Sequence, residues 1–256
     1  MDSRLKELPE WPIALPDFAL DLSHTALVVV DMQEVHCRPE LGLGRMIETV
    51  PSVSAYFWPR LESVVANQKH LLDFFRARRA HRLFLTIGPN ASDGSDLAPW
   101  RRRRNDRMNA TVGGNSYPKA DSSGPRGILK DLEVREDEIV LNKPTFGAFA
   151  STGIDQVLRS WDTRQLVVCG QATNVCVYLT AGEAADRGYE CCVVEDACAA
   201  YSDALHIAFL QNFALLFGRV ADTPTVLAEL DSAASGATMG SEPAGSGKLG
   251  GSEPTR

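Results

Sequence analysis

Short apolar runs alternate with amphipathic segments along most of the chain. The runs TALVVV at 25–30 and RLFLTI at 82–87 are apolar at most positions, which is typical of strands covered on both faces of a parallel sheet. Weaker runs predict further strands at 138–141, 166–169, 189–194 and 214–217. Apolar spacing and helix-end signals predict helices at 59–80, 154–159, 174–187, 203–213 and 223–230. Strands that alternate with helices predict a doubly wound α/β fold, in which helices cover both faces of a mostly parallel sheet.

Two segments interrupt this alternation. Residues 88–130 are rich in glycine, proline, serine, asparagine and arginine and show no sustained period, so we expect an insertion that forms a lid or binding loop. After residue 232 the chain becomes small, polar and rich in glycine, a composition typical of disorder. The sequence therefore predicts one domain at 1–232, with an extension at 1–24, followed by a disordered tail at 233–256.

The composition limits the classes of function. A chain of 256 residues with 44% hydrophobic content suits a globular domain with a substantial core, and a net charge of −7 disfavours general nucleic-acid binding. No apolar run approaches the length of a transmembrane helix, and the first residues carry acids and prolines instead of a signal-peptide run. The six cysteines form no CxxC pair and no disulfide framework. We therefore expect a cytoplasmic protein with no membrane or nucleic-acid partner.

Three polar residues lie at or just beyond the ends of predicted strands. Asp31 ends the first strand, Lys143 follows the strand at 138–141, and Cys176 lies after the turn that follows 166–169. Ligands of doubly wound sheets bind beyond the carboxyl ends of the strands. We expect these residues to meet there, on strands that are neighbours.

The cysteine occupies the first turn of its predicted helix, with Thr173 or Asn174 as N-cap. The helix amides and a nearby ammonium from Lys143 are expected to lower the pKa of the thiol, and Asp31 could take its proton. Each residue has an ordinary alternative: a helix-capping aspartate, a solvated lysine, a buried cysteine that fills an apolar gap. Their shared position favours catalysis.

Four segments of the chain resemble the isochorismatase-like cysteine hydrolases. They are VVVDMQ (28–33), KPTFGAF (143–149), VVCGQATNVCVYLTAGEAADRGY (167–189) and VVEDACAA (193–200), and the resemblance extends over 26–220. The resemblance implies a six-stranded parallel sheet, a homodimer or homotetramer, and a catalytic triad of Asp31, Lys143 and Cys176. It also implies a cis peptide between Gln171 and Ala172, and an oxyanion hole formed by the backbone amides of Ala172 and Cys176.

The implied reaction is hydrolysis of a carbon–nitrogen bond in a small amide or ureide through a thioester, without a cofactor. Members that cleave the vinyl ether of isochorismate lack the nucleophilic cysteine. Nicotinamidases add a metal site with an Asp-x-His element, and none of the five histidines here lies in one, so we expect no catalytic metal. The segments look closest to biuret, triuret and ureidoacrylate hydrolases and N-carbamoyl amidases. A nicotinamidase-like amidase, and a catalytically silent scaffold or redox-responsive thiol protein, remain alternatives.

The substrate pocket is less clearly marked. His36 stands where the family often has phenylalanine in an Asp-x-Gln-x-x-Phe stretch. The arginines at 101–104 form either a solvated basic loop or a cluster from which one guanidinium reaches a substrate carboxylate or carbonyl. Candidate pocket residues are Gln33, His36, Trp100, Arg102, Phe146, Phe149 and Asn174, although the aromatic residues among them could equally belong to the core.

Overall fold

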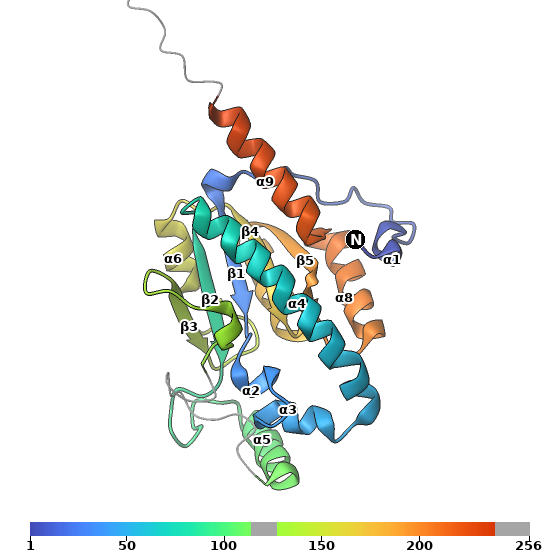
Figure 1. The fold of residues 1–256 in the computed structure, drawn as a ribbon, viewed down its shortest axis with the longest axis vertical. Coiled ribbons are helices and arrows are strands. Elements are labelled where there is room, and N and C mark those ends of the chain that lie inside the picture. The colour runs from blue at the N-terminus through green and yellow to red at the C-terminus, as the bar shows by residue number, and fades with distance from the viewer. Residues whose placement is uncertain (114–126, 239–256) are drawn as a thin grey trace, which may run out of the picture.

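The computed structural model describes residues 1–113 and 127–238 (Figure 1). Six parallel strands form one sheet in the order β3-β2-β1-β4-β5-β6. The strands are β1 (Thr25–Val30), β2 (Arg82–Ile87), β3 (Ile139–Lys143), β4 (Gln165–Gln171), β5 (Glu190–Ala199) and β6 (Gly218–Ala221). This arrangement confirms the predicted fold class. The strand order reverses between β1 and β4, which is where doubly wound sheets bind ligands.

Helices cover both faces of the sheet. They are α1 (Ser3–Lys6), α2 (Glu34–Cys37), α3 (Gly42–Glu48), α4 (Pro51–Ala77), α5 (Pro99–Val112), α6 (Ile154–Ser160), α7 (Tyr178–Ala185), α8 (Asp203–Leu216) and α9 (Thr223–Thr238), with short 3₁₀ turns at η1 (Leu22–His24) and η2 (Lys130–Leu132). In Figure 1, α4 crosses the sheet in the foreground, and α9 contacts both α4 and β5. Right-handed connections place α6, α7 and α8 on the opposite face. Within the described ranges, no helix is both long and apolar enough to span a membrane.

The core explains the apolar runs of the sequence. Every residue of β1 and of β4 is buried, because these central strands have neighbours on both sides and helices on both faces. The α4 helix contributes Phe57, Leu71 and Phe75, each completely buried. Burial of side chains of this size stabilises the fold by about 1.5–3 kcal/mol each.

A glycine lets β1 and β4 approach closely at their carboxyl ends. Gly170 pairs with Val30 in the register of the two strands and has a φ of +126°. A Cβ at this position would overlap the carbonyl oxygen of Val30, so no other residue fits without moving a strand. The next residues, Asp31 and Gln171, are thereby brought side by side.

Two helices differ from the sequence-based expectation. The α4 helix begins at Pro51 and contains Pro59, whereas a start at Pro59 is predicted; the earlier turns persist because Phe57 packs in the core. The α5 helix lies inside 88–130, where no regular structure is predicted. Its sequence is almost wholly polar and carries no apolar period, but Arg101 ties it to the domain by donating to the carbonyl oxygen of Pro144 at 2.5 Å.

The carboxyl-terminal part differs at two places. The predicted strand at 214–217 is the end of α8, and β6 follows it directly, because the helical conformation keeps Phe213 and Leu215 buried. The α9 helix continues to Thr238, past the predicted domain end at 232. The remainder of the predicted tail, and residues 114–126 of the predicted lid, lie outside the described residues.

Candidate active site

Asp31 is held rigidly where β1 ends. Its φ of +52° lies in the left-handed region, which aspartate tolerates better than most residues. Its amide donates to the carbonyl oxygen of Leu85 at 2.9 Å. Its own carbonyl oxygen accepts from Gln171 Nε2 at 3.1 Å and pairs with His36 Nδ1 at 3.2 Å. These bonds fix the direction in which the carboxylate points.

A buried ion pair joins Asp31 to the end of β3. The Nζ atom of Lys143 lies 2.7 Å from Oδ2 of Asp31, and the exposed fractions of the two side chains are 0% and 2%. Contrary to the prediction, β3 is not a neighbour of β1, because β2 lies between them; the length of the lysine side chain bridges the gap. The second carboxylate oxygen, Oδ1, is buried and accepts no hydrogen bond from the described residues. It is therefore available as a proton acceptor.

Cys176 lies in a π-helical turn, η3 (Thr173–Val177), between β4 and α7. The carbonyl oxygen of Ala172 accepts from the amides of Val175 at 2.9 Å and Val177 at 3.2 Å. The peptide bond between Gln171 and Ala172 is cis. A 2.9 Å hydrogen bond joins Thr173 Oγ1 to His206 Nδ1 on α8. The turn that carries the thiol is thus fastened to the neighbouring helix.

The environment of Cys176 keeps its thiol protonated. Burial raises its pKa to about 12; the negative charge of Asp31 contributes to the increase, and the ammonium of Lys143 opposes it. This result contradicts the expectation that the helix terminus lowers the thiol pKa. The reason is that the sulfur is almost completely buried and faces a carboxylate as well as an ammonium.

The sulfur and the carboxylate share one cavity of about 120 Å³. Its wall is formed by Asp31, His36, Leu43, Ile87, Arg104, Phe146, Gln171, Ala172, Val175, Cys176 and Tyr201. Burial lowers the pKa of His36, so its ring is neutral at physiological pH. The volume is somewhat smaller than the roughly 150 Å³ cavity known to hold benzene, so the site suits a small molecule.

The predicted pocket residues occupy several different places. His36 and Phe146 line the cavity. Gln33 is buried next to β2, where its Oε1 accepts from the amide of Ile87 at 2.8 Å. Trp100 is half exposed, and its ring lies 6.1 Å from that of Phe146. Asn174 and Phe149 are not among the lining residues, and the latter packs against Tyr189 with ring centroids 5.8 Å apart.

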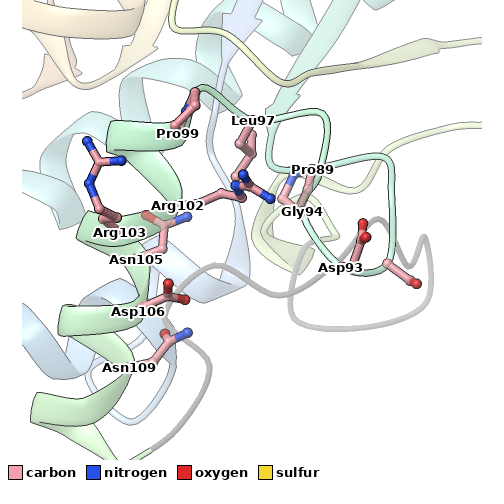
Figure 2. Close-up of a pocket in the computed structure, with 11 residues that line it drawn as sticks. Pro89, Asp93, Gly94, Leu97, Pro99, Arg102, Arg103, Asn105, Asp106 and Asn109 are labelled. Carbon is pink, nitrogen blue, oxygen red and sulfur yellow. The ribbon is translucent and has the colours of Figure 1, made fainter.

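Arg102 lies outside the cavity, contrary to the prediction. It lines a separate pocket of about 430 Å³ between α5 and the preceding loop, and Figure 2 shows it with Gly94 and Leu97 of that loop. Arg104, two residues along the helix, points to the opposite side and lines the cavity of Cys176. The correct arginine could be found only by knowing that 99–112 is a helix.

Tyr201 is a second residue that the sequence reasoning missed. It follows β5 by two residues, so the strand-end argument that found Asp31 would have found it too. Within the described part of the chain, no group of three or more histidine, cysteine, aspartate or glutamate side chains is arranged to hold a metal ion.

Comparison with known proteins places this chain in a family. The model of the isochorismatase domain matches residues 25–225. YwoC, an isochorismatase family protein of Bacillus subtilis, is 29% identical over 206 residues, covering 80% of this chain and 92% of the relative. The ureidoacrylate amidohydrolase RutB of Yersinia enterocolitica is 29% identical over 229 residues, covering 86% and 93%. The crystal structure of a cysteine hydrolase from Pseudomonas syringae superimposes with a TM-score of 0.70 at 26% identity, covering 87% of this chain and 100% of the other. The chain therefore belongs to the isochorismatase family of hydrolases.

Proposed function

We propose that the protein is a cysteine-dependent amidohydrolase that cleaves a carbon–nitrogen bond of a small amide or ureide. The observation that carries the proposal is the buried Asp31–Lys143 pair, which shares a cavity of about 120 Å³ with Cys176. The similarity to a relative named ureidoacrylate amidohydrolase supports cleavage of a carbon–nitrogen bond.

In the first step the thiol proton moves to Oδ1 of Asp31 while the sulfur attacks the carbonyl carbon. Because the thiol is protonated at rest, proton transfer and attack have to be coupled. The transfer creates no net charge in the buried site: an ammonium, a carboxylate and a thiol become an ammonium, a carboxylic acid and a thiolate. Lys143 keeps its proton and stabilises whichever neighbour is negative. By resemblance to the family, the backbone amides of Ala172 and Cys176 would donate to the developing oxyanion.

The tetrahedral adduct then collapses. The carbon–nitrogen bond breaks as Asp31 returns the proton to the nitrogen, and ammonia or an amine departs. Cys176 then carries a thioester or its carbamoyl equivalent. Water attacks this intermediate while Asp31 takes one of its protons. The carbon–sulfur bond breaks, the proton returns to the sulfur, and the acid is released.

Ammonia release over a panel of amides tests the proposal. The panel contains nicotinamide, biuret, triuret, N-carbamoyl amino acids and aryl amides. We expect Cys176→Ala to abolish turnover of whichever compound the native protein hydrolyses, because the nucleophile is lost. Cys192→Ala is the matched control, since Cys192 is equally buried but lies in β5, outside the cavity. Full turnover by Cys176→Ala, or loss of turnover in both variants, would contradict the proposal.

A further inference from the structure

Arg104 enters the cavity from a different direction than the reacting groups. It is carried by α5, whereas Asp31 and Cys176 follow strands of the sheet. Arg104 is partly exposed, whereas Asp31 and Gln171 on the same wall are 1% exposed. Arg104 is therefore closer to solvent than the residues that carry the carboxylate and the sulfur, since Cys176 is only 6% exposed.

Aromatic rings hold this guanidinium in place. Its central carbon lies 5.4 Å from the ring centroid of Trp100 and 5.6 Å from that of Phe146. Both distances are within the range of cation–π attraction. Stacking of this kind orients the planar fork but uses none of its N–H donors.

Among the described residues, Arg104 has no acceptor of the kind that several other arginines have. Its Nε is buried and has no hydrogen-bond partner among the described residues, and no carboxylate of the described chain lies within ion-pair distance of its guanidinium. By contrast, Arg76 and Arg219 each bind a glutamate through two nitrogens. Because Nε is buried, the two terminal nitrogens are the donors that can reach a ligand, and a guanidinium can bind a carboxylate through both of them.

The charges around the cavity also favour an anionic ligand. The ammonium of Lys143 and the carboxylate of Asp31 neutralise each other at 2.7 Å, and the buried ring of His36 is neutral. Of the described residues that line the cavity, Arg104 is the one whose charge is left uncompensated. An anionic group on the ligand would complete the balance.

We propose that Arg104 binds the carboxylate of the substrate, so that the protein prefers small amides or ureides of short-chain acids over neutral ones. This inference rests on the proposed function and names its substrate class. A cavity of about 120 Å³ has room for a carbamoyl or acyl amide group and a linker of one or two carbons, with the carboxylate at the outer wall. Arg104 would then set the distance between the carboxylate and the carbonyl carbon that Cys176 attacks.

A pair of isosteric ligands tests the charge preference. N-carbamoylglycine and isobutylurea share the ureide and the branched end, but only the former carries a carboxylate. We expect the Arg104→Gln variant to raise the KM for N-carbamoylglycine by about 10- to 100-fold, the range of a lost charge-assisted hydrogen bond, with kcat changed far less. Arg104→Lys should recover part of the loss, and the KM for isobutylurea should change much less in Arg104→Gln than the KM for N-carbamoylglycine. Arg102→Gln is the matched control on the same helix, since Arg102 lines the other pocket, shown in Figure 2.

Binding to the Cys176→Ala variant separates this inference from the proposed function. Calorimetric titration of this variant with N-carbamoylglycine should show binding, whether or not the native protein hydrolyses the compound. The double variant that also carries Arg104→Gln should not bind it. Equal affinity for the two ligands, absence of binding by N-carbamoylglycine, or equal loss for both ligands in Arg104→Gln would overturn the role of Arg104. Failure of the proposed function would appear separately, as full turnover by Cys176→Ala on a verified amide.

Discussion

Replacement of Asp31 by asparagine is expected to have opposite effects on two properties of Cys176. Burial raises the pKa of the thiol to about 12, and the charge of Asp31 contributes to this value. Asp31→Asn removes the negative charge, keeps the shape and leaves the ammonium of Lys143 in place. The thiol should therefore ionise more readily, although the variant has lost the proton acceptor that the reaction needs.

The magnitudes follow from the environment of the sulfur. A pKa raised to about 12 leaves very little thiolate at pH 7. Removing a charge within a few ångströms shifts a pKa by about 1–3 units, so alkylation of Cys176 at a fixed pH should become roughly 10- to 1000-fold faster. Turnover should fall by about 10²- to 10⁴-fold, the usual contribution of a general base.

Iodoacetamide labelling between about pH 6 and about pH 9, followed by mass spectrometry of each cysteine peptide, measures the first effect. In the native protein the labelling rate of Cys176 should rise about tenfold per pH unit without levelling off. Cys192 serves as an internal standard, because burial raises its pKa to about 12 without a contribution from Asp31. A buried ammonium left without its partner destabilises a protein by about 3–5 kcal/mol, so the folded state of the variant has to be verified by circular dichroism.

Two results would refute this reasoning. One is a native labelling rate that levels off below pH 8, since it would mean that the thiolate already exists at rest. The other is a folded Asp31→Asn variant whose Cys176 reacts no faster than in the native protein.

The remaining predictions concern the fold around the site. Lys143→Met should lower the free energy of unfolding by about 3–5 kcal/mol in urea, because it leaves a buried carboxylate unpaired; an unchanged midpoint would exclude a buried pair. Gly170→Ala should destabilise the protein strongly, since the φ of Gly170 is +126° and the added Cβ would meet the backbone of a neighbouring strand. Gly182→Ala in α7 adds a Cβ that meets nothing within 4 Å, so it should stabilise the protein by about 0.5–1 kcal/mol. Thermal unfolding compares the two variants. Burial acts to raise the pKa of Glu138, but hydrogen bonds from Arg76 and a second arginine lower it to about 2. Its contribution to stability is thus complete above about pH 5 and lost as the pH falls towards 2, and Glu138→Gln should flatten this part of the stability profile; an identical profile would contradict the assignment.

The strands and the reacting residues could be predicted because both follow from local pattern and topology. The run at 25–30 is apolar from Ala26 onwards because β1 is covered on both faces, and Asp31 marks its end. Parallel strands bring their carboxyl ends to one edge, so residues far apart in the chain could be expected to meet there.

The α5 helix and its arginines could not be predicted in the same way. The helix is polar on all sides, so no apolar period marks it. Without the helix, nothing distinguishes Arg104, which lines the cavity, from Arg102, which faces the opposite side. Which arginine reaches the site depends on the direction of each side chain from the helix, and the composition of the segment gives no information about this direction.

The protonation state of the Cys176 thiol could not be predicted from the local sequence pattern either. A cysteine in the first turn of a helix suggests a lowered pKa, because the helix amides are visible in the sequence. Its complete burial and the nearness of Asp31 arise only when β1 and β4 pack together. These two effects outweigh the helix terminus and reverse the direction of the shift.

Mass spectrometry of the protein quenched during turnover tests the central claim most directly. With a hydrolysed amide in excess, the peptide that contains Cys176 should carry the acyl group of the substrate without its amine, and Asp31→Asn should not accumulate this adduct. Turnover with no modification of Cys176 at any quench time, together with an active Cys176→Ala variant, would contradict nucleophilic catalysis by this sulfur.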